Sequence, residues 1–136
     1  MRLNWQHFDN FFSLYDLLKN RPRMFYVIGE THHCYIGSVG GCGGNRGLAQ
    51  RYEKQYIERT KAIFGSNATS DQPAFASIID DQEISQVDIV PIERQLQNIF
   101  IGVHGINNAL FTPRGLAANF QLTHTGDVPS FLADII

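Results

Sequence analysis

Two short apolar runs, separated by a polar connection, constrain the fold of this chain most strongly. Residues 24–28 and residues 34–39 are rich in aromatic and β-branched side chains, which favour strands. The connecting residues 29–33 are polar apart from one glycine. This arrangement is typical of a β-hairpin. Tyr26 falls on the first expected strand and Tyr35 on the second.

The segment before the hairpin has the spacing of an amphipathic helix. In residues 4–20, apolar side chains recur three and four positions apart. The helix should end before Pro22, because a residue that precedes proline avoids helical geometry. An N-terminal helix is therefore expected at about 4–20.

The segment after the hairpin begins with a glycine-rich loop. Five of the eight residues in 40–47 are glycine, which predicts a turning loop, and residues 48–64 should form a helix. A third strand is expected at 74–80. Pro91 suits the first turn of a helix and should open one at about 92–101.

The 136 residues match the length of one ordinary domain. We expect a core at about 23–108 and a C-terminal extension at about 109–136, irregular apart from a short helix at 128–135. Apolar residues in this extension favour packing over the domain or a partner surface, so a homodimer is one expectation. The sequence shows neither a signal-peptide pattern nor a run long enough to span a membrane, and two cysteines make no disulfide framework. A cytoplasmic location is the simplest interpretation.

Charge is distributed unevenly along the chain. Residues 1–61 carry nine Lys and Arg against five Asp and Glu, whereas residues 62–136 carry two against eight. Five of the basic residues lie between Arg46 and Lys61. A basic segment in a mildly acidic protein is typical of a contact with phosphates. A solvated helix face explains the same pattern, since Glu53 and Glu58 lie among these cations.

Together these elements predict an α+β fold with a small three-stranded antiparallel sheet flanked by helices. The ordered segments Phe25-Tyr26-Val27-Ile28, Tyr35-Ile36-Gly37-Ser38 and Leu48-Ala49-Gln50-Arg51, followed by Glu93, resemble the signature of the GIY-YIG nucleases. Tyr35-Ile36-Gly37 matches the second motif fully. The first motif keeps only its tyrosine, and Gln55 stands where many members of that family have His or Tyr.

The resemblance implies a metal-dependent endonuclease that hydrolyses phosphodiester bonds, in DNA rather than RNA. Its catalytic residues would be Tyr26, Tyr35, Arg51 and Glu93. Tyr26 is expected to act as the base and Tyr35 to position the water or phosphate. A guanidinium suits a phosphate oxygen, and a single carboxylate is sufficient for Mg²⁺ or Mn²⁺ that keeps several waters. The metal ligand would be Glu93.

Further residues are expected to contact the nucleic acid. They lie in the second motif, in the glycine loop, on the helix that follows it and after the Glu93 helix, where Asn107 fits as well as Asn108. The expected contacts are Gly37, Ser38, Asn45, Arg46, Lys54, Gln55, Tyr56, Arg59 and Asn108.

Other interpretations of the same residues stay open. Strand tyrosines are often core residues, Arg51 can pair with a neighbouring glutamate, and Glu93 in a first helical turn favours the helix dipole. His32, His33, Cys34 and Cys42 match no usual zinc spacing. The degenerate first motif and Gln55 favour an alternative function, a nucleic-acid-binding protein on the same fold with weakened or lost cleavage. An interaction protein is a third class of function.

Overall fold

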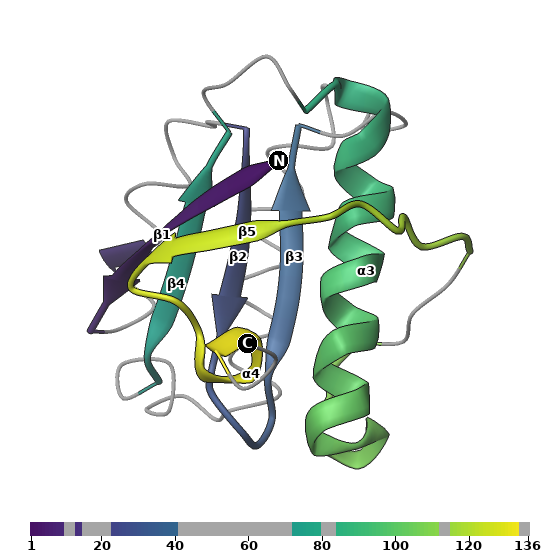
Figure 1. The fold of residues 1–136 in the computed structure, drawn as a ribbon. Helices are drawn as coiled ribbons and strands as arrows, with labels where there is room; N and C mark the ends of the chain where they lie inside the picture. Colours follow the sequence, from purple (N-terminus) through teal and green to yellow (C-terminus); the bar gives the residue numbers. More distant parts are fainter. Residues whose placement is uncertain (10–12, 15–22, 41–71, 80–83, 112–114, 134–136) are drawn as a thin grey trace, which may run out of the picture.

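The computed structural model describes residues 1–9, 13–14, 23–40, 72–79, 84–111 and 115–133, and all structural statements concern these residues. They form an α+β arrangement with one five-stranded sheet in the order β3-β2-β4-β1-β5 (Figure 1). The strands are β1 (Arg2–Phe8), β2 (Met24–Ile28), β3 (Tyr35–Val39), β4 (Ala74–Ile78) and β5 (Thr123–Gly126). The remaining elements are α3 (Gln86–His104), the 3₁₀ helix η2 (Ile106–Asn108) and α4 (Ser130–Ala133).

The expected hairpin and third strand are confirmed. β2 pairs with β3 and with β4, both antiparallel, so the predicted three strands lie at one side of the sheet. The prediction that the sheet has only three strands is wrong. β4 also pairs with β1 in antiparallel fashion, and β1 pairs with β5 in parallel fashion, which makes the sheet mixed.

The predicted N-terminal helix is wrong over residues 4–8, because β1 occupies Arg2–Phe8. Leu3 and Trp5 are buried, whereas their neighbours Arg2, Asn4 and Gln6 are exposed, which is the alternation of a half-buried strand. Pairing with strands on both sides outweighs the helical spacing further along the segment. Most of residues 10–22 lie outside the described part of the chain.

The prediction that a helix opens at Pro91 is also wrong, since α3 begins five residues earlier and runs through the proline. Four apolar residues, Ile89, Ile92, Leu96 and Phe100, recur at three- and four-residue spacing and are fully buried. Proline removes one helical hydrogen bond, but a continuous buried stripe outweighs that loss. α3 lies alongside β3 (Figure 1).

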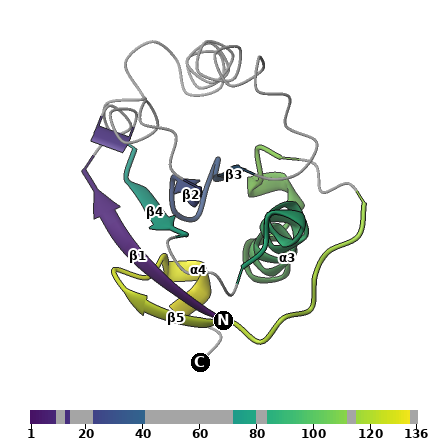
Figure 2. The same ribbon diagram turned by 90° about the horizontal axis from the view of Figure 1, so that it is seen from above.

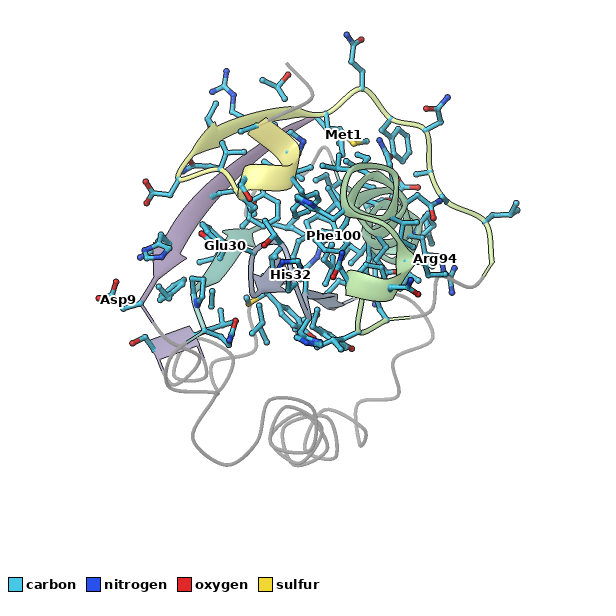
Figure 3. The ribbon with its side chains drawn as sticks, turned by 90° about the horizontal axis from the view of Figure 1, so that it is seen from below. Met1, Asp9, Glu30, His32, Arg94 and Phe100 are labelled. Carbon is cyan, nitrogen blue, oxygen red and sulfur yellow. The ribbon has the colours of Figure 1, made fainter. Side chains whose placement is uncertain are left out.

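The core has two parts, one on each face of the sheet. The larger part joins Phe25, Val27 and Ile36 to the buried stripe of α3 and to Phe131 and Leu132 of α4. Seen from above, the sheet curves around α3 and α4 (Figure 2). Phe100 lies in the middle of this cluster (Figure 3), with its ring edge-on to Phe131 at 5.4 Å between centroids.

The smaller part of the core lies on the opposite face. It contains Met24, Tyr26 and Ile28 of β2 with Ala74 and Ala76 of β4 and Leu14. Because side chains alternate along a strand, residues 25 and 27 point to α3 while residues 24, 26 and 28 point away from it. This division decides which candidate site residues can meet.

The C-terminal segment was expected to be irregular except for a short helix, and the structure corrects this in one respect. A helix is present at Ser130–Ala133, but Thr123–Gly126 forms β5 beside β1. Before β5, the chain passes along α3, where the backbone of Phe120 makes two hydrogen bonds to the side chain of Gln95, at 2.8 and 3.1 Å. The amide of Ala118 donates to the carbonyl of Pro91 at 2.9 Å.

Candidate active site at the β2–β3 hairpin

The two motif tyrosines are brought together by the register of the hairpin. Tyr26 pairs with Gly37, and Tyr35 pairs with Ile28, so both tyrosines lie on the face away from α3. Their rings are stacked, with centroids 6.2 Å apart and planes inclined by 15°. Since Gly37 has no side chain, the space beside Tyr26 is left for the ring of Tyr35.

The two tyrosines differ in their access to solvent. Tyr26 is on β2, an interior strand, and is only 1% exposed. Tyr35 is on the edge strand β3 and is half-buried. A group that transfers a proton to or from water or a substrate needs access to it. Burial therefore favours Tyr35, rather than the expected Tyr26, as the tyrosine that meets a ligand.

Glu93 reaches the same strand from α3. Its Oε1 accepts a hydrogen bond from the hydroxyl of Ser38 at 3.1 Å. Ser38 directly follows Gly37, so the end of the second motif contacts the predicted metal ligand. Ser38 pairs with Phe25, which belongs to the part of the core under α3. The Ser38–Glu93 pair is consequently on the face of the sheet opposite the tyrosine pair.

The carboxyl of Glu93 is perturbed by its surroundings. Burial raises its pKa to about 7, and the hydrogen bond from Ser38 and the charge of Arg94 oppose this rise. At neutral pH the carboxyl is therefore divided between its acid and its ionised form. A titratable group with a pKa near 7 is suited to proton transfer or to binding a cation as the proton leaves.

The residues of the predicted site are only partly brought together. Five of them lie on β3 or beside it, on two faces of the sheet: Tyr26, Tyr35, Gly37, Ser38 and Glu93. Asn108 lies in η2, beyond the far end of α3. The predicted contacts Asn45, Arg46, Arg51, Lys54, Gln55, Tyr56 and Arg59 all lie outside the described residues.

Asn108 is instead joined to the tip of the hairpin. Its Oδ1 is 2.8 Å from Nδ1 of His32, and its Nδ2 donates to the backbone carbonyl of His104 at 2.7 Å. Its own carbonyl accepts from the amide of Cys34 at 3.0 Å. The sequence places His32 at an exposed tip, but it contains no signal that links this residue to one 76 positions later.

Among the described residues, Glu93 supplies a carboxylate beside β3 for the predicted divalent cation. In the described part of the chain, no three His, Cys, Asp or Glu side chains converge to hold a metal. Mg²⁺ commonly binds through one or two carboxylates together with waters and substrate phosphates. Glu93 supplies one such carboxylate, with one oxygen engaged by Ser38. The donor set fits an ion that is held largely by water and substrate.

Comparison with protein-family models, with characterised proteins and with solved structures gives no match. No helix in the described ranges is both long and apolar enough to cross a membrane. Functional inference therefore depends on the residues around β3.

Proposed function

We propose that this chain is a divalent-metal-dependent endonuclease of the GIY-YIG type that hydrolyses phosphodiester bonds, with DNA favoured over RNA as its substrate. The observation that carries the proposal is the stacked pair Tyr26–Tyr35, set in register by Gly37, with Glu93 bonded to the next residue of the same motif. Tyr26 and Glu93 thus contact the strand that carries the second motif from opposite faces of the sheet.

The outer edge of β3 is the proposed position of the scissile phosphate. No described strand pairs with this edge, and Tyr35 and Ser38 on it are both half-buried. Side chains from the two faces of a sheet come closest to each other at such an edge. A phosphate there would lie between the phenol of Tyr35 and the carboxyl of Glu93.

Each residue would have a distinct task. Tyr35 orients the attacking water or takes its proton, and Tyr26 holds the ring of Tyr35 by stacking against it. Glu93 holds the divalent cation, and Ser38 fixes the orientation of that carboxyl. A bound Mg²⁺ would neutralise charge on the phosphate. Arg51 would contribute a further positive charge.

A nucleic-acid-binding protein with little or no cleavage is the second candidate. One observation favours it: Glu93 is half-buried, bonded to Ser38 and on the opposite face from the tyrosines. In this alternative, Glu93 and Tyr26 hold the fold together, and only the surface of the hairpin and the basic segment contact the ligand.

The deciding experiment is a cleavage assay with supercoiled plasmid, a branched duplex and a single strand. Each substrate is incubated with Mg²⁺, with Mn²⁺ and with chelator. Tyr35→Phe and Glu93→Gln change the proposed chemistry with little change in volume. Asp9→Asn is the matched control, because this carboxylate is exposed and distant from the hairpin in the sheet.

For the nuclease we expect metal-dependent nicking that Asp9→Asn retains and that Tyr35→Phe and Glu93→Gln reduce by roughly 100-fold or more, the range typical of a lost catalytic group. Salt-sensitive binding without cleavage under every metal condition would establish the second candidate. If neither binding nor cleavage occurs, both candidates are wrong, and the partner is to be sought among proteins.

A further inference from the structure

The tip of the β2–β3 hairpin is fastened to the segment after α3 by a compact set of hydrogen bonds. The amide of Cys34 donates to the carbonyl of Asn108 at 3.0 Å, and the amide of Leu110 donates to the carbonyl of Cys34 at 2.8 Å. Cys34 itself is fully buried. The tip therefore has a fixed position relative to η2 although its own residues are exposed.

This fastening also fixes the ring of His32. The amide nitrogen of Asn108 donates to the carbonyl of His104, so its oxygen Oδ1 faces His32 as an acceptor. Nδ1 of His32 must then carry the proton and donate it at 2.8 Å. The other ring nitrogen, Nε2, belongs to an exposed side chain, and no bond to it is present among the described residues. Figure 3 shows His32 at this end of the molecule.

His32 has an oriented side chain, and its neighbour His33 does not. His33 is adjacent in sequence and also exposed, but its side chain has no hydrogen bond within the described part of the chain, and its backbone has the unusual φ of 52°. A surface histidine normally samples several rotamers. His32 is held instead by a side chain that is itself held, which is the arrangement of a pre-organised binding group.

We propose that His32, oriented by Asn108, is a phosphate-binding residue that contacts the nucleic-acid backbone away from the cleavage position. The proposal rests on the proposed nucleic-acid function and adds a second contact to it. When Nε2 gains a proton, the imidazolium donates one bond to Asn108 and offers the other N–H to a phosphate oxygen. The bond to Asn108 is the same in both protonation states, so charging the ring does not disturb its orientation.

The position of His32 agrees with a remote contact. His104, whose carbonyl anchors Asn108, is eleven positions after Glu93 on α3, and a helix rises about 1.5 Å per residue, which gives about 16.5 Å. One strand of a duplex advances about 3.4 Å along its axis per phosphate. His32 would therefore contact a phosphate several nucleotides from one bound beside Glu93.

The titratable side chains nearest to this contact along the chain are Glu30, His33 and Cys34 of the hairpin and His104 at the end of α3. The ring of His104 packs against Phe100 at 5.1 Å between centroids, so it is turned toward the core. Glu30 is exposed on the turn and is a negative charge that a phosphate must tolerate. Of the two exposed histidines, only His32 has a fixed donor direction.

The test is binding of a labelled duplex, followed by fluorescence anisotropy in chelator to prevent cleavage, at pH 6 and pH 8 and at several salt concentrations. The variants are His32→Gln, Asn108→Ala and Asn108→Asp, with His33→Gln as the matched control. The fluorescence of Trp5, the single tryptophan, reports whether each variant is folded.

At pH 6 we expect His32→Gln to weaken binding roughly tenfold, the loss expected for one charge-assisted hydrogen bond. The same substitution should reduce the slope of log K against log salt by about 0.9, the value for one phosphate contact. Asn108→Ala should act in the same direction, and His33→Gln should change neither quantity. Asn108→Asp keeps an acceptor oxygen for Nδ1 of His32 and should therefore retain more affinity than Asn108→Ala.

The inference about His32 is wrong if His32→Gln and His33→Gln behave alike while the original chain still binds the duplex. That result would leave the proposed function intact. If the original chain binds no nucleic acid at either pH, the proposed function and this contact are both wrong.

Discussion

Ser38 and Glu93, 55 positions apart in the chain, form a hydrogen bond of 3.1 Å that joins the edge strand β3 to α3. Burial raises the pKa of this carboxyl, and the serine hydroxyl lowers it again. The pair therefore links the stability of the helix–sheet contact to the protonation of one carboxyl. It also makes Glu93 the residue whose structural and chemical roles must be separated by experiment.

The first prediction concerns stability and pH. The Glu93 carboxyl has a pKa of about 7 in the folded chain and about 4.5 ordinarily. Between these values the folded chain holds a proton that the unfolded chain has lost, so the free energy of unfolding should fall as pH rises from about 4.5 to 7 and then level off. Glu93→Gln should remove this component of the decline. Urea unfolding followed by Trp5 fluorescence at pH 5, 6, 7 and 8 measures it, and Asp9→Asn should retain the decline of the original chain.

The second prediction concerns a buried amide between α3 and β3. Gln97 is 6% exposed, and its Nε2 donates to the carbonyl of Ile36 at 3.0 Å. Gln97→Met keeps the volume but leaves that carbonyl without its donor, which should cost about 1–3 kcal/mol. Asn98→Ala, at the exposed neighbouring position, should change the free energy of unfolding by less than about 0.5 kcal/mol. Equal effects of the two substitutions would show that the amide bond contributes nothing.

The third prediction concerns the segment that passes along α3. The side chain of Gln95 both donates to and accepts from the backbone of Phe120. Gln95→Ala should increase hydrogen exchange at the Phe120 amide, while the Ala118 amide, bonded to Pro91, keeps more of its protection. Asn119→Ala alters an exposed residue of the same segment and should leave both amides as they are. Unchanged exchange at Phe120 in Gln95→Ala would contradict this attachment.

The fourth prediction compares two glycines. Gly126 has a φ of +80°, and an added Cβ would collide with the backbone carbonyl of Trp5. Gly126→Ala should therefore destabilise the chain by about 2 kcal/mol or more, since strain and overlap act together. Gly102 lies in α3 with open space around it, so Gly102→Ala should stabilise by about 0.5–1 kcal/mol through helix propensity. Thermal unfolding of both variants tests the expected difference in sign.

The parts of the fold predicted correctly from sequence are those specified by neighbouring residues. The strands at Met24–Ile28 and Tyr35–Val39 are short β-rich runs next to a turn, and Ala74–Ile78 has a similar composition. β1 was missed because Trp5 and Leu3 acquire their strand conformation from partners far along the chain. β5 was missed because Thr123–Gly126 has no apolar run and is a strand only beside β1.

The candidate site was likewise predicted only in part. The hairpin was predicted from sequence, but whether Tyr26 and Tyr35 share a face depends on its register, which the sequence left open. The positions of Glu93 and Asn108 depend on where α3 begins and how it packs, and the early start of that helix was not predicted. Contacts across 55 and 76 positions, to Ser38 and His32, are properties of tertiary packing alone.

The parallel pairing of β1 with β5 also has a consequence for the order of folding. Arg2 pairs with Thr123, so the edge of β1 that faces β5 stays uncovered until this distant segment has been synthesised. Contacts of such long sequence separation slow folding, because a large loop must close before they form. Leu3 and Trp5 would remain partly uncovered during this interval. The β1–β5 seam is thus a part of the sheet that can close only after residues 123–126 have joined the growing chain.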